Sequence, residues 1–222
     1  MSLLSEKDRQ HLIQEFTGLQ HPVHLIVFTQ EFECQLCRET RQIAEEVAAL
    51  SDMISLEVLD FVADAEQARQ YNIDKIPATI LMQGGDAVKD FGIRYYGVPS
   101  GYEFSSLIFD ILMVGRGDSG LAQPTREWLA HLTVPVHLQV FVTPTCPYCP
   151  RAVLLAHQFA MESDLVTADM VEATEFPDMA IKYQVMGVPR TVINETIFQE
   201  GAAPEGHLLA KLQQAMAQVL AV

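Results

Sequence analysis

Two pairs of cysteines are the residues of this chain best suited to chemistry. All four cysteines of the 222-residue sequence fall into C-x-x-C pairs, "CQLC" at 34–37 and "CPYC" at 146–149. Cysteines at this spacing can bind a metal ion, form a structural crosslink, or cycle between dithiol and disulfide. Since the thiolate is the reactive form in metal binding and in disulfide exchange, the surroundings of each pair must decide between these alternatives.

The chain repeats itself, and each copy contains one of the two pairs. The segment "HPVHLIVF" at 21–28 matches "VPVHLQVF" at 134–141. Further along, the copies stay in register with an offset of 112 residues in three matched pairs: Cys34 with Cys146, Cys37 with Cys149, and Pro77 with Pro189. Each copy thus has a proline 43 residues after its first cysteine. An internal repeat of this kind predicts two similar structural units with one site each.

The elements that must position the cysteines follow from the hydrophobic pattern, in which β-branched apolar runs predict strands and a helical period predicts helices. In the first copy the predicted order is strand 23–28, helix 37–50, strand 54–61, helix 64–72, strands 77–82 and 90–97, and helix 101–115. In the second copy it is strand 136–141, helix 149–161, strand 164–171, helix 175–184, strands 189–193 and 196–200, and helix 204–220. A further helix precedes each copy, at 5–16 and at 124–132. The sequence therefore predicts an α/β fold with the order βαβαββα twice.

A short segment rich in glycine, with serine and proline, separates the copies. "GRGDSGLAQP" at 115–124 clusters residue types that favour turns and loops. We therefore expect an N-terminal unit at 1–118, which contains CQLC, and a C-terminal unit at 119–222, which contains CPYC. With 49% hydrophobic residues, the chain has enough apolar material for one large core or two smaller ones.

A zinc site shared by the two pairs is the strongest alternative to redox chemistry. Two C-x-x-C pairs can bind zinc tetrahedrally, but the usual spacing between them is about 15–20 residues. Here 108 residues separate Cys37 from Cys146, and each pair belongs to its own copy. A purely structural C-x-x-C disulfide would close a loop so short that it removes little entropy from the unfolded chain. We expect no metal, and a zinc-stapled binding module remains the non-enzymatic alternative.

The position of each pair favours disulfide exchange. Each lies where an apolar strand gives way to a helix, and a helix N-terminus offers partial positive charge and free N–H groups that favour a thiolate. The first cysteine, Cys34 or Cys146, is then the nucleophile that attacks the disulfide of a partner. The second, Cys37 or Cys149, lies one helical turn later and resolves the mixed disulfide.

The combination of strand, C-x-x-C, helix and a later Ile76-Pro77 or Val188-Pro189 resembles the thioredoxin and glutaredoxin fold. The doubled arrangement resembles the glutaredoxin-like protein disulfide oxidoreductases of archaea and bacteria over nearly the whole chain, and "VFVTPTCPYCPRAVLLAH" is especially similar to the second half of that family. The resemblance implies two thioredoxin-like units, each with a central mixed four-stranded sheet flanked by helices. It also implies that both prolines are cis and line the substrate groove with the residues that precede them, and that the C-terminal pair is the main active site.

Two departures from the related families bear on the chemistry. Glutaredoxins that use glutathione have a Gly-Gly-x-Asp-like stretch after the last strand, whereas "PRTVINETIFQEGAAPEG" lacks one. We therefore do not expect glutathione as the natural substrate. Thioredoxins bury an aspartate beneath the first cysteine, and Phe28 and Val140 occupy the comparable positions here. Any group that carries protons to the cysteines must come from elsewhere in the chain or from solvent.

The two pairs differ in their charged neighbours. Cys146 has no acidic neighbour, and Arg151 follows it in the predicted helix. Three carboxylates surround the first pair: Glu31, Glu33 and Glu39. Because nearby negative charge disfavours a thiolate, we predict that the C-terminal pair carries most of the activity and that the N-terminal pair is slower or relays electrons.

Charge and hydropathy limit the classes of partner. With 14 basic and 29 acidic residues the formal net charge is −15, which argues against binding to nucleic acid or to an anionic membrane. No apolar run approaches the ~20 residues of a membrane span, and "MSLLSEKDRQ" has no signal-peptide core, so we expect a cytoplasmic protein.

The expected partners are proteins with disulfides to be reduced, formed or isomerised. The resemblance implies no bound cofactor, and reducing equivalents from an NADPH-dependent flavoprotein similar to thioredoxin reductase. An alternative is an electron relay from such a flavoprotein to a peroxiredoxin. The N-terminal module of alkyl hydroperoxide reductase flavoproteins is also a tandem thioredoxin fold, but it keeps its C-x-x-C only in the second unit, whereas both pairs are present here.

Overall fold

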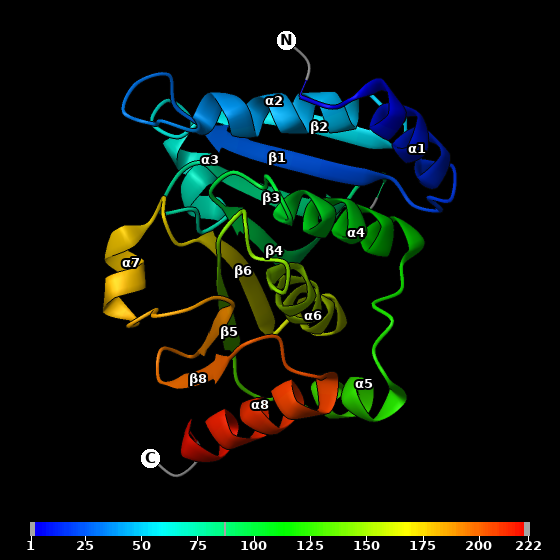
Figure 1. Ribbon diagram of the computed structural model, residues 1–222. Coiled ribbons are helices and arrows are strands. Elements are labelled where there is room, and N and C mark those ends of the chain that lie inside the picture. Colours follow the sequence, from blue (N-terminus) through cyan, green and yellow to red (C-terminus); the bar gives the residue numbers. More distant parts are fainter. Residues whose placement is uncertain (1–2, 87, 220–222) are drawn as a thin grey trace.

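The structure is a computed structural model that describes residues 3–86 and 88–219 (Figure 1). The first copy contains α1 (Glu6–Phe16), β1 (Val23–Thr29), α2 (Cys37–Ala48), β2 (Ile54–Asp60), α3 (Ala65–Gln70), β3 (Ala78–Gln83), β4 (Lys89–Tyr96) and α4 (Glu103–Arg116). The second contains α5 (Gln123–Ala130), β5 (Val136–Val142), α6 (Cys149–Glu162), β6 (Val166–Glu172), α7 (Pro177–Lys182), β7 (Arg190–Ile193), β8 (Ile197–Glu200) and α8 (Glu205–Val219). Every helix and strand predicted from the sequence is present, with ends that differ by no more than two residues.

Each copy builds the predicted mixed sheet of four strands. In the first, β1 pairs in parallel with β2 and antiparallel with β3, and β3 continues antiparallel to β4. The second copy repeats this with β6, β5, β7 and β8. The central strands β1 and β5 are buried along most of their length, which explains why their sequences are continuous apolar runs rather than alternating ones.

The two sheets are joined edge to edge. Residues Ile93–Tyr96 of β4 pair in parallel with Ala168–Val171 of β6, which gives one eight-stranded sheet in the order β2-β1-β3-β4-β6-β5-β7-β8. The hydrophobic cores also run through both copies. Leu25 and Leu138 belong to one core, and Phe28 and Phe141 belong to the other core. The expected boundary at 118/119 falls between α4 and α5 and stays a prediction.

Two glycines allow the copies to approach closely. Gly101 has φ +60°, and a Cβ there would lie 2.2 Å from the carbonyl oxygen of Pro144. The next residue, Tyr102, donates its backbone N–H to that same oxygen at 2.9 Å. Gly97, with φ +98°, would place a Cβ 2.6 Å from Cβ of Glu172. Since other residues rarely adopt these dihedrals and would clash, glycine is required where the first copy meets the loops of the second.

Helices cover both faces of the sheet. Figure 1 shows α4 and α6 together on one face, where the two helices pack against each other across the junction of the copies. None of the helices within residues 3–86 and 88–219 has the length and hydropathy needed to cross a membrane.

Candidate active sites

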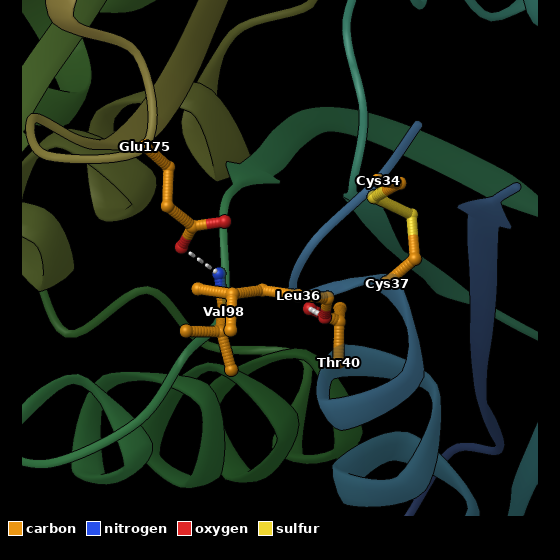
Figure 2. Close-up of a disulfide and its surroundings, with 6 residues drawn as sticks. All are labelled: Cys34, Leu36, Cys37, Thr40, Val98 and Glu175. Atoms are coloured by element: carbon orange, nitrogen blue, oxygen red, sulfur yellow. Dashed lines mark hydrogen bonds between the residues drawn. A yellow bond between two sulfur atoms is a disulfide. The ribbon is translucent and has the colours of Figure 1, made fainter. Parts of the chain in front are cut away.

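The first cysteine pair forms a disulfide at the start of α2 (Figure 2). The helix begins at Cys37, so Cys34 lies in the turn that precedes it rather than in the helix itself. Cys34 is half-buried, and Cys37 is buried. The carbonyl oxygen of Leu36, between the two cysteines, accepts hydrogen bonds from the backbone N–H and the hydroxyl of Thr40, which anchors the first turn of the helix.

The second pair forms an equivalent disulfide at the start of α6. Cys146 is 7% exposed, and Cys149 is fully buried. The backbone N–H of Cys149 donates to the sulfur of Cys146 at 3.1 Å. A donor in this position stabilises negative charge on the sulfur and so favours the thiolate once the pair is reduced. Among the described residues, the first pair shows no equivalent of this bond.

Each copy brings its proline to the end of the sheet where the cysteines lie. The bonds Ile76–Pro77 and Val188–Pro189 are both cis, as the family resemblance implied. The strand after each proline runs beside the strand that leads to the cysteines, so that Ala78 pairs with Phe28 and Arg190 with Phe141. The carbonyl oxygens of the prolines accept backbone hydrogen bonds, from Gly97 at 2.9 Å and from Gly201 at 2.8 Å. The role of these prolines in substrate binding stays a prediction.

A carboxylate from the second copy bonds to the backbone of the first copy. Glu175 accepts a hydrogen bond from the backbone N–H of Val98 at 2.7 Å, and Figure 2 shows Leu36 between Val98 and the Cys34–Cys37 disulfide. Burial raises the pKa of Glu175 to about 7, and the charges of Glu172 and Glu39 add to this rise. The sequence did not predict this contact, because Glu175 lies 77 residues from Val98 along the chain.

Glu103 is a buried carboxyl group close to the contact between α4 and the loop of the second site. It lies in the first turn of α4, next to Tyr102, which is bonded to Pro144 in the loop before Cys146. Its side chain is 1% exposed, and one oxygen accepts from the hydroxyl of Ser106 at 2.6 Å. The other oxygen has no hydrogen-bond partner among the described residues. Burial raises the pKa of Glu103 to about 7.

The sequence analysis missed Glu103, although a signal was present. In "GYEFSSLIFDILMVG", Glu103 and Asp110 stand seven residues apart within an apolar helix, and that spacing places both on one face. Both side chains are buried. Asp110 lies within 2.5 Å of Nδ1 of His157 on α6 and accepts from the hydroxyl of Tyr95 on β4. This polar cluster links the two copies inside the core.

The described residues contain no group of three or more His, Cys, Asp or Glu side chains that could hold a metal ion. Each cysteine is instead bonded to the other member of its own pair. The structure thus presents two separate dithiol–disulfide centres, each built from one C-x-x-C pair and one cis-proline.

Comparisons with known proteins agree with this arrangement. Residues 136–214 match the family model for a thioredoxin domain. The chain is 29% identical over 175 residues to the alkyl hydroperoxide reductase AhpF of Xanthomonas campestris pv. phaseoli, a match that covers 79% of this chain and 31% of the relative. The chain thus spans about a third of the length of the curated relatives it matches.

Two solved structures resemble the whole chain. The N-terminal domain of alkyl hydroperoxide reductase AhpF from Enterococcus faecalis superposes with a TM-score of 0.85 at 26% identity, covering 93% of this chain and 98% of that one. A protein disulfide oxidoreductase from Aeropyrum pernix superposes with a TM-score of 0.88 at 31% identity, covering 95% of this chain and 93% of that one. The chain belongs to the tandem thioredoxin-fold protein disulfide oxidoreductases, whose C-x-x-C pairs carry out thiol–disulfide exchange.

Proposed function

We propose that this protein exchanges disulfides with partner proteins and that Cys146 and Cys149 form its main active site. The observation that carries the proposal is the hydrogen bond from the N–H of Cys149 to the sulfur of Cys146. Because this donor stabilises a thiolate, Cys146 is the stronger nucleophile of the two first cysteines. The acidic surroundings of Cys34 make the first pair the slower site.

In the reducing direction, the Cys146 thiolate attacks one sulfur of the partner's disulfide. The partner's other sulfur leaves as a thiolate and takes up a proton, and a mixed disulfide remains. Cys149 then loses its proton and attacks the Cys146 sulfur, which releases the second partner thiol. Two electrons have moved to the partner, and the Cys146–Cys149 disulfide has formed again. Oxidation of a partner follows the same steps in reverse.

We assign Glu103 as the group that accepts the proton of Cys149 and returns it. Its carboxyl is buried in the helix that packs against α6, and one of its oxygens has no partner among the described residues. A pKa of about 7 lets it both accept and release a proton near neutral pH. It thereby takes the place, at the second site, of the aspartate that thioredoxins have where this chain has Val140.

The prolines and the residues before them form the other wall of each site in this proposal. Pro77 and Pro189, preceded by Ile76 and Val188, come directly before Ala78 and Arg190, which pair with the strands that lead to the cysteines. In this proposal the two structural units span residues 1–118 and 119–222.

The proposed reductant is an NADPH-dependent flavoprotein similar to thioredoxin reductase. The proposed compartment is the cytoplasm, where thiols are kept reduced.

A second candidate function is an electron relay from a flavoprotein to a peroxiredoxin. The likeness to the N-terminal domain of AhpF over 93% of this chain favours it. Comparing the kcat/KM for insulin with that for a peroxiredoxin, each with the same reductase, separates the two functions. A general protein disulfide oxidoreductase is expected to act on insulin at least as well as on the peroxiredoxin.

Reduction of insulin by single variants tests the ranking of the sites. We expect Cys146→Ser to lower the rate by tenfold or more, because it removes the nucleophile of the main site. Cys34→Ser should lower it by less than about threefold. Initial rates with dithiothreitol as the electron source check this prediction, and a larger loss in Cys34→Ser than in Cys146→Ser contradicts it.

A further inference from the structure

A groove of about 800 Å³ opens between the two copies beside the first cysteine pair. Helices α1, α2 and α4 of the first copy line it, together with Pro144, Glu172, Thr174 and Glu175 of the second copy. Leu36, which stands between Cys34 and Cys37, is part of the lining. Figure 2 shows Leu36 next to the disulfide, with Val98 beyond it and Glu175 beyond Val98, and all three residues line the groove. Neither cysteine is among the described lining residues, so a molecule bound here would contact the first site through Leu36.

Apolar side chains form much of the lining. Phe109 is 52% exposed, which is unusual for a phenylalanine on a helix that is otherwise well packed. Exposed apolar surface within a concavity is typical of a place where another molecule binds. The apolar lining on α4, on α2 and at the residue before α2 consists of six residues: Leu36, Ile43, Phe104, Ile108, Phe109 and Leu112.

Five carboxylates line the groove, beside the polar residues His11, Ser100, Ser105 and Thr174. No lysine or arginine is found among the described residues that line the groove. Its carboxylates come from α1, α2, the end of β6 and the loop after it: Asp8, Glu15, Glu39, Glu172 and Glu175.

Glu172 in particular lacks a counter-charge. It is 1% exposed, and its Oε1 has no hydrogen-bond partner among the described residues, while its Oε2 accepts from Thr174 and from the N–H of Glu175. The neighbouring Glu175 has a pKa raised to about 7 by burial and by the charges of Glu172 and Glu39. Burying carboxylates next to each other without a cation is unfavourable, so a bound positive charge would relieve this repulsion.

We propose that this groove binds an apolar segment of the partner protein that carries a lysine or arginine next to the cysteine exchanged at Cys34. The proposal rests on the proposed function, since it names the substrate class of the first site. Apolar side chains of the segment pack against Leu36 and Phe109, and its cation pairs with the accessible carboxylates of Glu39 and Glu175, next to the buried Glu172. Glu39, one of the acidic residues that slow Cys34, thus also selects its substrates.

Binding of two cysteine-free peptides to the intact protein tests the groove independently of catalysis. One labelled peptide contains Leu, Phe and two Lys, and the other has Glu in place of each Lys. We expect the lysine peptide to bind about tenfold more tightly by fluorescence anisotropy at pH 8, where Glu175 is ionised. Glu39→Lys should weaken its binding by about fivefold. Glu45→Lys makes the same charge change on α2 outside the groove and should have no effect.

A second pair of variants tests the apolar lining. Phe109→Ser should weaken the binding of both peptides by at least about threefold, because it removes exposed apolar surface from the groove. Ile181→Ser removes a side chain of 75% exposure on α7, outside the groove, and should leave both affinities unchanged.

The same peptides, made as disulfide-linked dimers through an added cysteine, connect binding to exchange. In a Cys146→Ser, Cys149→Ser background, we expect a kcat/KM about tenfold higher for the lysine dimer than for the glutamate dimer. Glu39→Lys should abolish this preference after normalisation to the small neutral substrate bis(2-hydroxyethyl) disulfide.

Equal affinity for the two peptides, or equal effects of Glu39→Lys and Glu45→Lys, overturns the groove proposal even where the small disulfide is still turned over. A different outcome is that the peptides still bind selectively but the first pair reduces neither peptide dimer nor bis(2-hydroxyethyl) disulfide. This outcome overturns the proposed role of the first pair in disulfide exchange, and with it the assignment of the groove to that exchange.

Discussion

One backbone hydrogen bond to Cys146 is expected to make its reactivity differ from that of Cys34. The N–H of Cys149 donates to the Cys146 sulfur, and the same donor remains available when that sulfur is a thiolate. Cys34 lies among exposed carboxylates, and Glu33 beside it has a positive φ of 60°. Two pairs with the same spacing are therefore expected to differ in reactivity, because their nearest donors and charges differ.

Glu103 gives a prediction at the residue scale that does not depend on activity. Its pKa is about 7 in the folded protein and 4.5 as the ordinary value. Between these pH values the folded protein holds a proton that the unfolded chain has lost, so burial of Glu103 lowers the free energy of unfolding as the pH rises. The free energy of unfolding of Glu103→Gln should therefore rise by up to about 3 kcal/mol relative to that of the wild type as the pH goes from 4.5 to 8. Urea unfolding at both pH values measures the difference.

The control for this experiment is Glu127→Gln, which changes an exposed glutamate on α5. Its unfolding free energy should follow that of the wild type at every pH. A Glu103→Gln variant that shows no pH-dependent gain would mean that Glu103 does not bind a proton near pH 7, and it would remove the basis for its role with Cys149.

At the scale of helices and strands, the contact of α4 with α6 joins the two copies. Its centre is the buried pair of Asp110 and His157, and the ring of Tyr95 packs edge-on against His157 with 5.1 Å between centroids. Nε2 of His157 and Oδ1 of Asp110 have no partners among the described residues. Such a pair is stabilising only while both members are present, because either one alone is left buried without its counterpart.

A double-mutant cycle tests this contact. Asp110→Ala and His157→Ala should each lower the free energy of unfolding by about 3 kcal/mol or more. The double variant should lose less than the sum of the two, by at least about 1 kcal/mol, since the second substitution no longer breaks the pair. Urea unfolding of the four proteins measures the coupling, and additive losses would contradict it.

The elements themselves were predictable, because each leaves a local pattern. Continuous apolar runs indicated β1 and β5, and the matched spacing of Cys34 and Pro77 with Cys146 and Pro189 located both sites. The pairing of β4 with β6 was not predictable, because parallel strands from different copies have no turn between them to mark their register. Glu175 was missed for the same reason, since its contact with Val98 depends on how the copies pack.

For the whole molecule, the continuous sheet makes two repeats into one folded body. The strand order and the cores both run across the junction of β4 and β6. Side chains of one copy consequently bond to the backbone of the other, as Glu175 does at Val98. The junction between the copies is thus held by side-chain contacts as well as by strand pairing.

A single unfolding transition is the expected consequence at this scale. The only tryptophan, Trp128, lies on α5 of the second copy, and its fluorescence reports on its environment there. Far-UV circular dichroism reports on both copies. The two signals should give the same urea midpoint in the oxidised protein, because separating the copies would break β4–β6 pairing and both cores. Two separated midpoints would show that the copies unfold independently.

The most direct test of the central claim is to trap the mixed disulfide. In Cys149→Ser the partner remains bound to Cys146, because no second thiol is present at that site to release it. We predict that Cys149→Ser with oxidised insulin accumulates an adduct that mass spectrometry maps to Cys146, faster than Cys37→Ser accumulates one at Cys34. A faster adduct at Cys34, or no adduct at Cys146, would contradict the assignment of Cys146 as the main nucleophile.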